Sequence, residues 1–201
     1  MNSESIPEYK IILASNSSIR QKILEDSGIS FEVVPSEVEE EELKQSLSSN
    51  NFREYCLALA KAKALDVSNK KKNAYVIGSD QICCYGEEIF SKPLTKENCF
   101  KTLSKLSGNT HYQNCGISIC KNGKEIWSHY AQAALTMKSL SDTEIWDYID
   151  KDEPFMACGA YRFESLGKNL FLTTKGDETT IQGLTLNPII NFLTSKKVIN
   201  L

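Results

Sequence analysis

A carboxylate preceded by two small residues stands directly after a short apolar run. Residues 74–77 read Ala-Tyr-Val-Ile, which is typical of a buried strand, and Gly78, Ser79, Asp80 and Gln81 follow. The carboxyl end of a buried strand is where α/β sheets usually place their sites, and the small Gly78 and Ser79 would allow a ligand to approach closely. The pattern makes Asp80 a candidate catalytic residue. The alternative interpretation is that Asp80 simply caps the next turn.

A hydroxyl-rich turn near the N-terminus has the character of an anion site. Residues 15–18 read Ser-Asn-Ser-Ser between an apolar run and a helical pattern, and Arg20 lies one turn further on. Backbone N–H groups and the dipole at a helix start favour negative charge, and Ser15 and Ser17 add donors. Ordinary N-capping by Ser17 or Ser18 would explain the same residues. The chain has neither a Walker lysine nor a Gly-x-Gly-x-x-Gly pattern, so the common nucleotide signatures do not apply.

Three lysines are candidates for binding phosphate. Lys61 and Lys63 interrupt an otherwise apolar helical segment, and Lys92 precedes Pro93, which stiffens the local backbone. Residues two apart cannot share a helix face, so at most one of Lys61 and Lys63 should point into a cleft. A solvated surface position is the alternative for each lysine.

Histidines and cysteines favour no metal or disulfide framework. His111 and His129 are the only histidines, and neither is accompanied by residues at ligand spacing. A magnesium-type site made of carboxylates and substrate phosphates stays open. The seven cysteines include no Cys-x-x-Cys pair, and we expect all of them to be reduced and structural. Composition also leaves Ser-His-Asp catalysis open, although the chain has no Gly-x-Ser-x-Gly elbow.

Composition and charge narrow the classes of function. The chain has 201 residues, of which 41% are hydrophobic and 24% charged, and its formal net charge is −3. A nucleic-acid binder would show a basic excess, so any phosphate site here must be built locally from a few Lys and Arg side chains. The N-terminus lacks the features of a signal peptide, and no run approaches the roughly 18 apolar residues of a membrane span. The sequence predicts a cytoplasmic protein without a nucleic-acid or membrane partner.

Hydrophobic periodicity predicts alternating strands and helices around these residues, which is typical of an α/β protein. Strands are expected at 9–14, 31–34, 74–77, 115–120 and 124–134, with two shorter candidates at 169–173 and 179–182. Helices are expected from 19 to a stop at Gly28, at 52–67, at 96–105, from a capping box at 141–144 to about 150, and from 186–188 to about 194. The segment 36–47 is rich in Glu and a poor core candidate. No repeat or long linker divides the chain, so residues 1–201 are expected to form one unit, and a division of that unit into two lobes stays open.

The ordered set of motifs resembles the Maf family of nucleotide pyrophosphatases. The matching strings are LASNSSIRQKIL, SEVEEE at 36–41, LAKAKA at 59–64, IGSDQ at 77–81, SKPLTKEN at 91–98, LSKLSGNTH at 103–111, LSDTEIWDYI at 140–149, CGAYRFESLG at 158–167 and GL at 183–184. Each string is weak alone, but they occur in family order over nearly the whole chain. The resemblance implies a mixed α/β sheet in two lobes flanked by helices around a central cleft, similar to Maf and ITPase folds, and often a homodimer.

The resemblance also implies roles for individual residues. Asp80 matches the family's catalytic aspartate, the proposed base for an attacking water. The positions that hold the triphosphate are matched by Ser15, Ser17, Arg20, Lys63 and Lys92. Glu39 matches an acidic position near a divalent metal, which Asp80 would share and which would be Mg, Mn or Co. Lys63 rather than Lys61 would then face inward, and the implied reaction is hydrolysis of a nucleoside triphosphate to a monophosphate and pyrophosphate.

Departures from the common family pattern point to one branch. Ile19 replaces an arginine, Gln81 follows the aspartate, Ala157 stands where a lysine is common, and Glu164 occupies YRFES. This combination is similar to the branch that prefers 7-methyl-GTP. Such a preference would fit Glu164, which could pair with the cationic ring and accept from its N1–H and N2–H. The dTTP/UTP branch would instead favour arginine, threonine and glutamine at 19, 81 and 164.

Two further alternatives remain at this stage. One is a nucleotide-binding regulator of septum formation without turnover, and the other is an enzyme that removes deaminated purine triphosphates. Asp80 argues against the first, because pure binding does not require a water-activating carboxylate.

Overall fold

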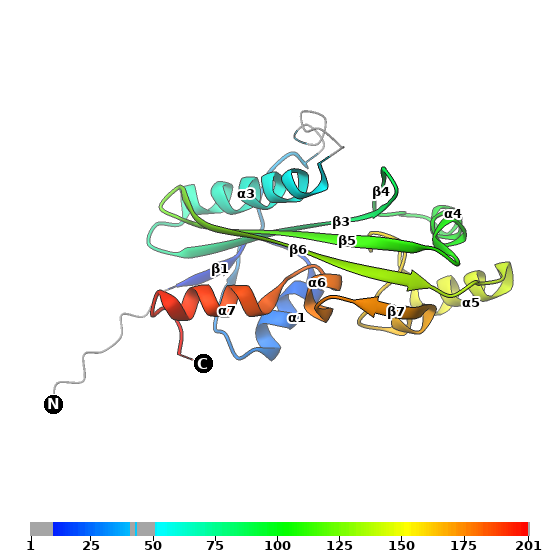
Figure 1. Cartoon of the computed structure of the whole chain (residues 1–201). Coiled ribbons are helices and arrows are strands. Elements are labelled where there is room, and N and C mark those ends of the chain that lie inside the picture. Colours follow the sequence, from blue (N-terminus) through cyan, green and yellow to red (C-terminus); the bar gives the residue numbers. More distant parts are fainter. Residues whose placement is uncertain (1–9, 41–42, 44–50, 201) are drawn as a thin grey trace.

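The architecture is a long twisted sheet with helices on both faces (Figure 1). The computed structural model describes residues 10–40, 43 and 51–200. In chain order the elements are β1 (Ile11–Leu13), α1 (Ser18–Asp26), β2 (Glu32–Val33), α3 (Phe52–Lys70), β3 (Tyr75–Tyr85), β4 (Glu88–Phe90), α4 (Lys96–Leu106), β5 (Thr110–Lys121), β6 (Lys124–Met137), α5 (Asp142–Asp152), the 3₁₀ helix η1 (Leu166–Leu170), β7 (Phe171–Lys175), α6 (Glu178–Ile181) and α7 (Leu186–Ser195).

The seven-stranded sheet has the order β2-β1-β3-β5-β6-β7, with β4 paired to β3. β1 is parallel to β2 and β3, and the remaining pairs are antiparallel. Asn122 and Gly123 make the predicted turn between β5 and β6, both with positive φ. The mixed α/β class is therefore confirmed, and the long antiparallel hairpin of β5 and β6 forms the central part of the sheet.

Helix α3 packs against one face of the sheet at two glycines. A Cβ on Gly78 would lie 2.2 Å from the Ala60 carbonyl oxygen, and one on Gly116 would lie 2.5 Å from the Cys56 carbonyl oxygen. Only glycine permits this approach, since the helix backbone occupies the space of a side chain. Ala64 packs beside Gly78 in the same contact.

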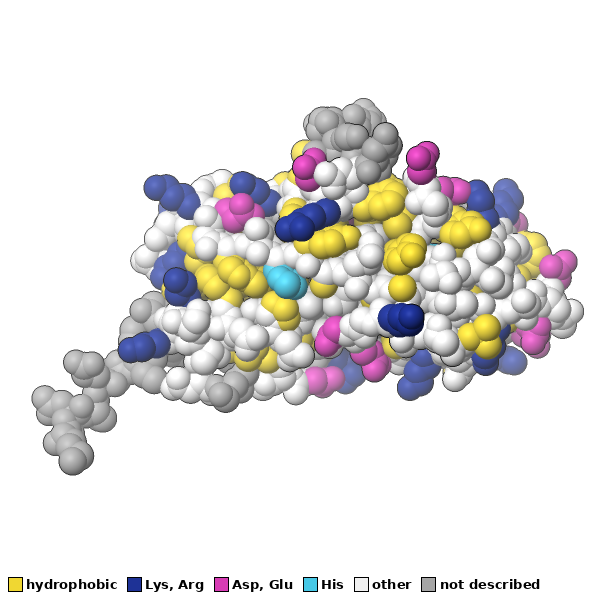
Figure 2. All heavy atoms as spheres, viewed as in Figure 1, with side chains coloured by type: hydrophobic (Ala, Val, Ile, Leu, Met, Phe, Trp, Pro, Cys, Tyr) yellow, Lys and Arg dark blue, Asp and Glu magenta, His cyan; other side chains and the backbone are white. Residues whose placement is uncertain are grey.

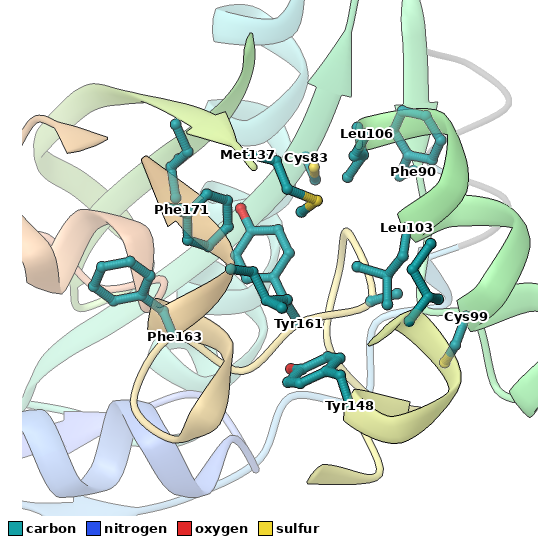
Figure 3. Close-up of a cluster of buried hydrophobic side chains, with 14 of the residues drawn as sticks. Cys83, Phe90, Cys99, Leu103, Leu106, Met137, Tyr148, Tyr161, Phe163 and Phe171 are labelled. Atoms are coloured by element: carbon teal, nitrogen blue, oxygen red, sulfur yellow. The ribbon is translucent and has the colours of Figure 1, made fainter. Parts of the chain in front are cut away.

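Two large apolar clusters occupy opposite ends of the long strands. One cluster joins α1 and α7 to β1 and to residues 115–119 of β5, and its members include Leu24, Ile117 and Leu193. The other joins α4 and α5 to the far ends of β3 and β6, and its members include Leu103, Ile149, Tyr161 and Phe171. In Figure 3 the ring of Tyr161 stands between Met137, Phe163 and Phe171, with Tyr148 below it. Each cluster packs against one end of the sheet, and the division into two lobes stays a prediction.

Most predicted elements are confirmed, with three corrections. The predicted strand at 179–182 is wrong: residues 178–181 form α6, because the Asp177 side chain accepts from the N–H groups of Thr179 and Thr180 and caps a helix. The predicted strand at 169–173 begins instead at Phe171, after η1. The strand expected at 74–77 continues to Tyr85, so Asp80 lies in its middle rather than at its carboxyl end.

All seven cysteines are free in the structure, and six of them are buried. Among the described residues, no helix is long and apolar enough to cross a membrane. On the face seen in Figure 2, acidic and basic side chains are interspersed, with no broad region of one sign.

Candidate functional site

The site begins with a gap along one edge of β3. Residue Cys83 of β3 pairs with Gln113 of β5 on one side and Phe90 of β4 on the other, so β4 and β1 share the edge opposite β5. β1 covers this edge only at residues 75–77 and β4 only at 83–85. Within the described chain, residues 78–82 therefore have no strand neighbour on that side.

Backbone groups of β3 face this gap. The carbonyl oxygen of Ile77 points to the shared edge, because it accepts the N–H of Ala14 at 2.8 Å. Backbone groups of alternate residues point to the same edge of a strand, so those of Ser79 and Gln81 are directed there as well. The Cys158 thiol confirms the direction by lying 3.8 Å from the Gln81 carbonyl oxygen. Fixed donors and acceptors are thus presented to anything that enters the gap.

A cavity of about 1050 Å³ opens at the gap. Ligand pockets in proteins are about 300–1,000 Å³, so this one could hold a nucleotide. The cavity is lined by every residue predicted for the site: Ser15, Ser17, Ile19, Arg20, Glu39, Lys63, Asp80, Gln81, Lys92 and Glu164. They come from the loop after β1, from α1, α3 and β3, and from the segments after β2, β4 and α5. The structure therefore brings together residues that lie far apart in the sequence, from Ser15 to Glu164.

Asp80 and Lys63 form a buried ion pair at the centre of the cavity. The Lys63 Nζ atom donates to Asp80 Oδ1 at 2.7 Å, and each side chain is 9% exposed. Glu40 Oε1 lies 3.0 Å from the same ammonium group. Lys61 points elsewhere and pairs with Glu125 at 3.0 Å on the surface. The helical spacing thus places only Lys63 inward, as predicted.

Arg20 reaches the cavity from the other face of the sheet. Its Nε donates to the Gly183 carbonyl oxygen at 2.8 Å, and Ser79, whose side chain points away from α3, donates its hydroxyl to the same oxygen at 2.8 Å. Arg20 Nη1 also donates to the Ser15 hydroxyl at 3.3 Å. Because Asp80 and Ser79 are consecutive, their side chains leave opposite faces of β3. Cations from both faces therefore meet at the open edge.

The loop between β1 and α1 is not explained by simple capping. Ser17 occupies the N-cap position of α1, but its side chain makes no capping hydrogen bond. Its backbone N–H donates instead to the Ser15 hydroxyl at 3.2 Å. The start of α1 faces the cavity with its dipole, an arrangement that favours an anion. Lys92, exposed just beyond β4, completes the set of predicted cations at the cavity wall.

The residues predicted to select the base occupy different environments. The Gln81 side-chain amide donates to the carbonyl oxygens of Thr180 and Ile181 at 3.0 and 2.6 Å, and so ties β3 to α6. The side chain of Glu164 is 26% exposed, and Arg162 Nε lies 3.4 Å from its Oε1. Ile19 lines the same cavity from α1. Gln81 thus has a clear structural contact, while Glu164 keeps an accessible carboxylate.

Two charged cavity residues that contact the predicted site residues were not themselves predicted from the sequence. Glu40 contacts Lys63, although Glu39 was the expected acidic residue; both line the cavity, and the role of Glu39 stays a prediction. Arg162 lies beside Glu164. The consecutive glutamates at 39–42 gave no basis for choosing one of them as the partner of Lys63. Arg162, two positions before Glu164, could have been recognised from the sequence as a possible partner of Glu164.

The acidic residues fit a hard cation only with help from a ligand. Among the described residues, no group of three His, Cys, Asp or Glu side chains is arranged to hold a metal ion. Asp80 and Glu40 nevertheless flank one positive charge, the Lys63 ammonium. Magnesium is commonly held by one or two carboxylates together with substrate phosphates, so this oxygen donor set suits it. Burial raises the pKa values of the Cys56 and Cys115 thiols, which makes them poor nucleophiles.

The fold and cavity define a mixed α/β protein with a large cavity at an interrupted sheet edge. The family model for Maf-like proteins matches residues 10–196, so the chain belongs to the Maf family. A protein of Legionella pneumophila (strain Corby) named nucleoside triphosphate pyrophosphatase is 40% identical over 99% of this chain and 100% of its own length. A protein of the same name from Pelagibacter ubique (strain HTCC1062) is 36% identical over 92% and 96% of the two chains.

Among solved structures, the Ham1 protein of Staphylococcus aureus aligns with 93% of this chain and 99% of its own at 15% identity. Its TM-score is 0.48.

Proposed function

We propose that this chain hydrolyses nucleoside triphosphates between the α and β phosphates, giving a nucleoside monophosphate and pyrophosphate. The observation that carries the proposal is the buried Asp80–Lys63 pair in a cavity that Arg20 enters from the opposite face. The names of the Legionella and Pelagibacter relatives point to the same activity.

The positions of the cations suit a triphosphate. Attack on the α phosphorus increases charge on its equatorial oxygens and on the leaving pyrophosphate. Lys63, Arg20 and Lys92 would neutralise that charge, and Ser15, Ser17 and the N–H groups at the start of α1 would position the phosphate oxygens. The fixed geometry would contribute to stabilisation of the transition state, because these groups are in position before the charge develops.

Asp80 is the proposed general base. In the free protein its carboxylate is occupied by Lys63, and phosphate oxygens would attract the ammonium group away from it. Asp80 could then accept a proton from a water aligned with the α phosphorus. Glu40 keeps a second contact to Lys63 and so limits how far this side chain moves.

A divalent cation fits the proposed site as a helper. Asp80 would hold it together with Glu40 or Glu39, and phosphate oxygens would complete its coordination. When bound, the ion would supply positive charge to the phosphates and lower the pKa of a bound water.

Within this activity we propose a preference for 7-methyl-GTP. Glu164 could accept from N1–H and N2–H of guanine and pair with the positive charge of the methylated ring, and Ile19 adds apolar surface without a repelling cation. Arg162 competes for Glu164, but partly exposed ion pairs contribute only about 0–1 kcal/mol. A dTTP/UTP preference is the alternative within the family.

The decisive experiment is a nucleotide panel with identification of products. We expect monophosphate and pyrophosphate from 7-methyl-GTP with a higher kcat/KM than from GTP, ITP, XTP, dTTP or UTP, and loss of activity with EDTA that Mg²⁺, Mn²⁺ or Co²⁺ restores. A clear dTTP or UTP preference would overturn the proposed base specificity. Nucleotide binding without pyrophosphate release would overturn the enzymatic proposal and favour the septum regulator.

A further inference from the structure

A buried carboxylate at the end of α5 has no part in the chemistry proposed above. Asp152 is the last residue of α5 and only 4% exposed. A carboxylate at a helix C-terminus faces the negative end of the helix dipole, and its burial costs solvation energy. Such a position is tolerated only where several donors compensate, and the identity of these donors indicates what the carboxylate does.

The donors belong to the segment that carries Glu164. The Ser165 hydroxyl donates to Asp152 Oδ1 at 2.6 Å, and Arg162 Nη1 lies 3.8 Å from the same oxygen. Arg162 Nη1 also donates to the Asp152 carbonyl oxygen at 3.3 Å. Asp152 therefore holds the residue after Glu164 and the residue two before it.

Tyr148 ties the same segment to α5 one turn earlier. Its hydroxyl donates to Asp152 Oδ2 at 2.8 Å and accepts from the Arg162 backbone N–H at 3.0 Å. Burial raises the pKa of Tyr148, so this hydroxyl keeps its proton and remains a donor. Figure 3 shows Tyr148 beneath Tyr161, next to the loop that leads to Phe163.

Arg162 transmits the contact to the cavity. Its Nε lies 3.4 Å from Glu164 Oε1 while its Nη1 is engaged by Asp152. The guanidinium is planar and rigid, so fixing one edge fixes the direction of the other. Glu164 is consequently held from its own side chain through Arg162 and from its backbone through Ser165.

We infer that Asp152 is a positioning residue for base selection, which acts by holding Glu164 at the cavity wall. The inference rests on the proposed function, because it assigns Glu164 to the base. Asp152 does not line the cavity, and its carboxylate is connected to it through the segment 162–165, whose Ser165 and Arg162 it contacts. A purely structural role would reduce activity toward all nucleotides alike, whereas positioning of Glu164 would change their ratio.

The test compares kcat/KM for guanine-type and pyrimidine triphosphates in Asp152→Asn, Ser165→Ala and Glu164→Gln. A hydrogen bond to a charged group corresponds to about a tenfold or larger change, so Glu164→Gln should reduce the guanine-to-pyrimidine ratio by about tenfold. Asp152→Asn should reduce the ratio by about fivefold and Ser165→Ala by about twofold, with pyrimidine turnover nearly unchanged, since each variant loosens Glu164 without removing it.

Asp150→Asn is the matched control, because Asp150 lies on the same helix but is exposed and pairs with Lys96 at 2.7 Å. It should leave the ratio unchanged. In the Glu164→Gln background, Asp152→Asn should have no further effect on the ratio, because the residue through which it acts is gone.

Equal loss for all nucleotides, an unchanged ratio in Asp152→Asn, or an additive effect in the double variant would overturn the inference while leaving the proposed hydrolysis intact. Absence of pyrophosphate release from any triphosphate by the wild-type protein would instead overturn the proposed function itself.

Discussion

Asp80 and Asp152 are both buried carboxylates, but their surroundings differ. Asp80 pairs with the flexible ammonium group of Lys63 and lines a cavity of about 1050 Å³. Asp152 is held by the hydroxyls of Tyr148 and Ser165 and lines no part of that cavity. The partner of the first carboxylate also lines the cavity, whereas the two hydroxyls that hold the second do not. The comparison therefore separates the group proposed to react from the group proposed to position.

The largest expected effect tests the reactive side of this comparison. Asp80→Asn should reduce kcat at least about 1,000-fold, because an amide cannot accept the proton from water. Its free energy of unfolding should fall by no more than about 1 kcal/mol, since the amide oxygen can still accept from Lys63 and Glu40 keeps the ammonium paired. Steady-state kinetics and urea unfolding measure the two quantities. Retained turnover would remove Asp80 from the proposed mechanism.

Asp152→Ala should show the opposite balance. Removing the carboxylate leaves the buried Tyr148 hydroxyl and the Ser165 hydroxyl without their acceptor, so we expect a loss of about 3 kcal/mol in the free energy of unfolding. Urea unfolding at neutral pH provides the measurement, with Asp150→Ala as the exposed control on the same helix. A loss no larger than that of the control would contradict the fixed role assigned to Asp152.

A smaller effect is expected from His111, which contacts the apolar cluster that contains Tyr148 and Tyr161. His111 is fully buried and contacts the Tyr161 hydroxyl at 2.9 Å through Nε2. Burial lowers the pKa of His111 from 6.5 to about 4. The unfolded chain therefore takes up a proton at a higher pH than the folded chain, and stability falls as pH drops from about 6.5 toward 4.

At pH 5 this linkage amounts to about 2 kcal/mol relative to pH 7. Unfolding curves of wild type and His111→Phe at both pH values measure it, because Phe abolishes the titration and can pack near Phe171. His129→Gln is a control at a less buried histidine, and it should retain most of the wild-type slope. Identical pH dependence in wild type and His111→Phe would show that His111 is not kept neutral by the fold.

The sequence predicted which residues line the cavity better than it predicted the contacts between them. Asp80 and Arg20 were candidates because of their types and local spacing. Helical spacing left Lys61 and Lys63 both open, and only the family resemblance selected Lys63. Hydrophobic periodicity located α3 and the β5–β6 hairpin. The length of β3 was underestimated, because a strand buried on both faces has no alternation that marks its end. The threonines at 179 and 180 suggested a strand, yet capping by Asp177 decided for a helix.

The contacts of Glu40, Arg162 and Asp152 depend on chain segments that meet only after folding. Glu40 pairs with a lysine on another element, and a row of similar carboxylates contains no signal for which one will do so. Asp152 is one of several acidic residues near the end of α5, and its burial follows from how the segment 153–165 returns across the helix. Local patterns therefore identify candidate chemistry, while long-range packing selects the members and their partners.

The two glycines beneath α3 have a consequence for how this site can change. Because the helix rests on bare backbone at Gly78 and Gly116, missing side chains rather than electrostatic attraction set how deep α3 sits and where Lys63 ends relative to Asp80. A single methyl group at either position would lift the helix and increase the distance between Lys63 and Asp80. No charged residue would need to be substituted for this change. The separation of the reacting groups is thus encoded in residues that carry no functional group at all.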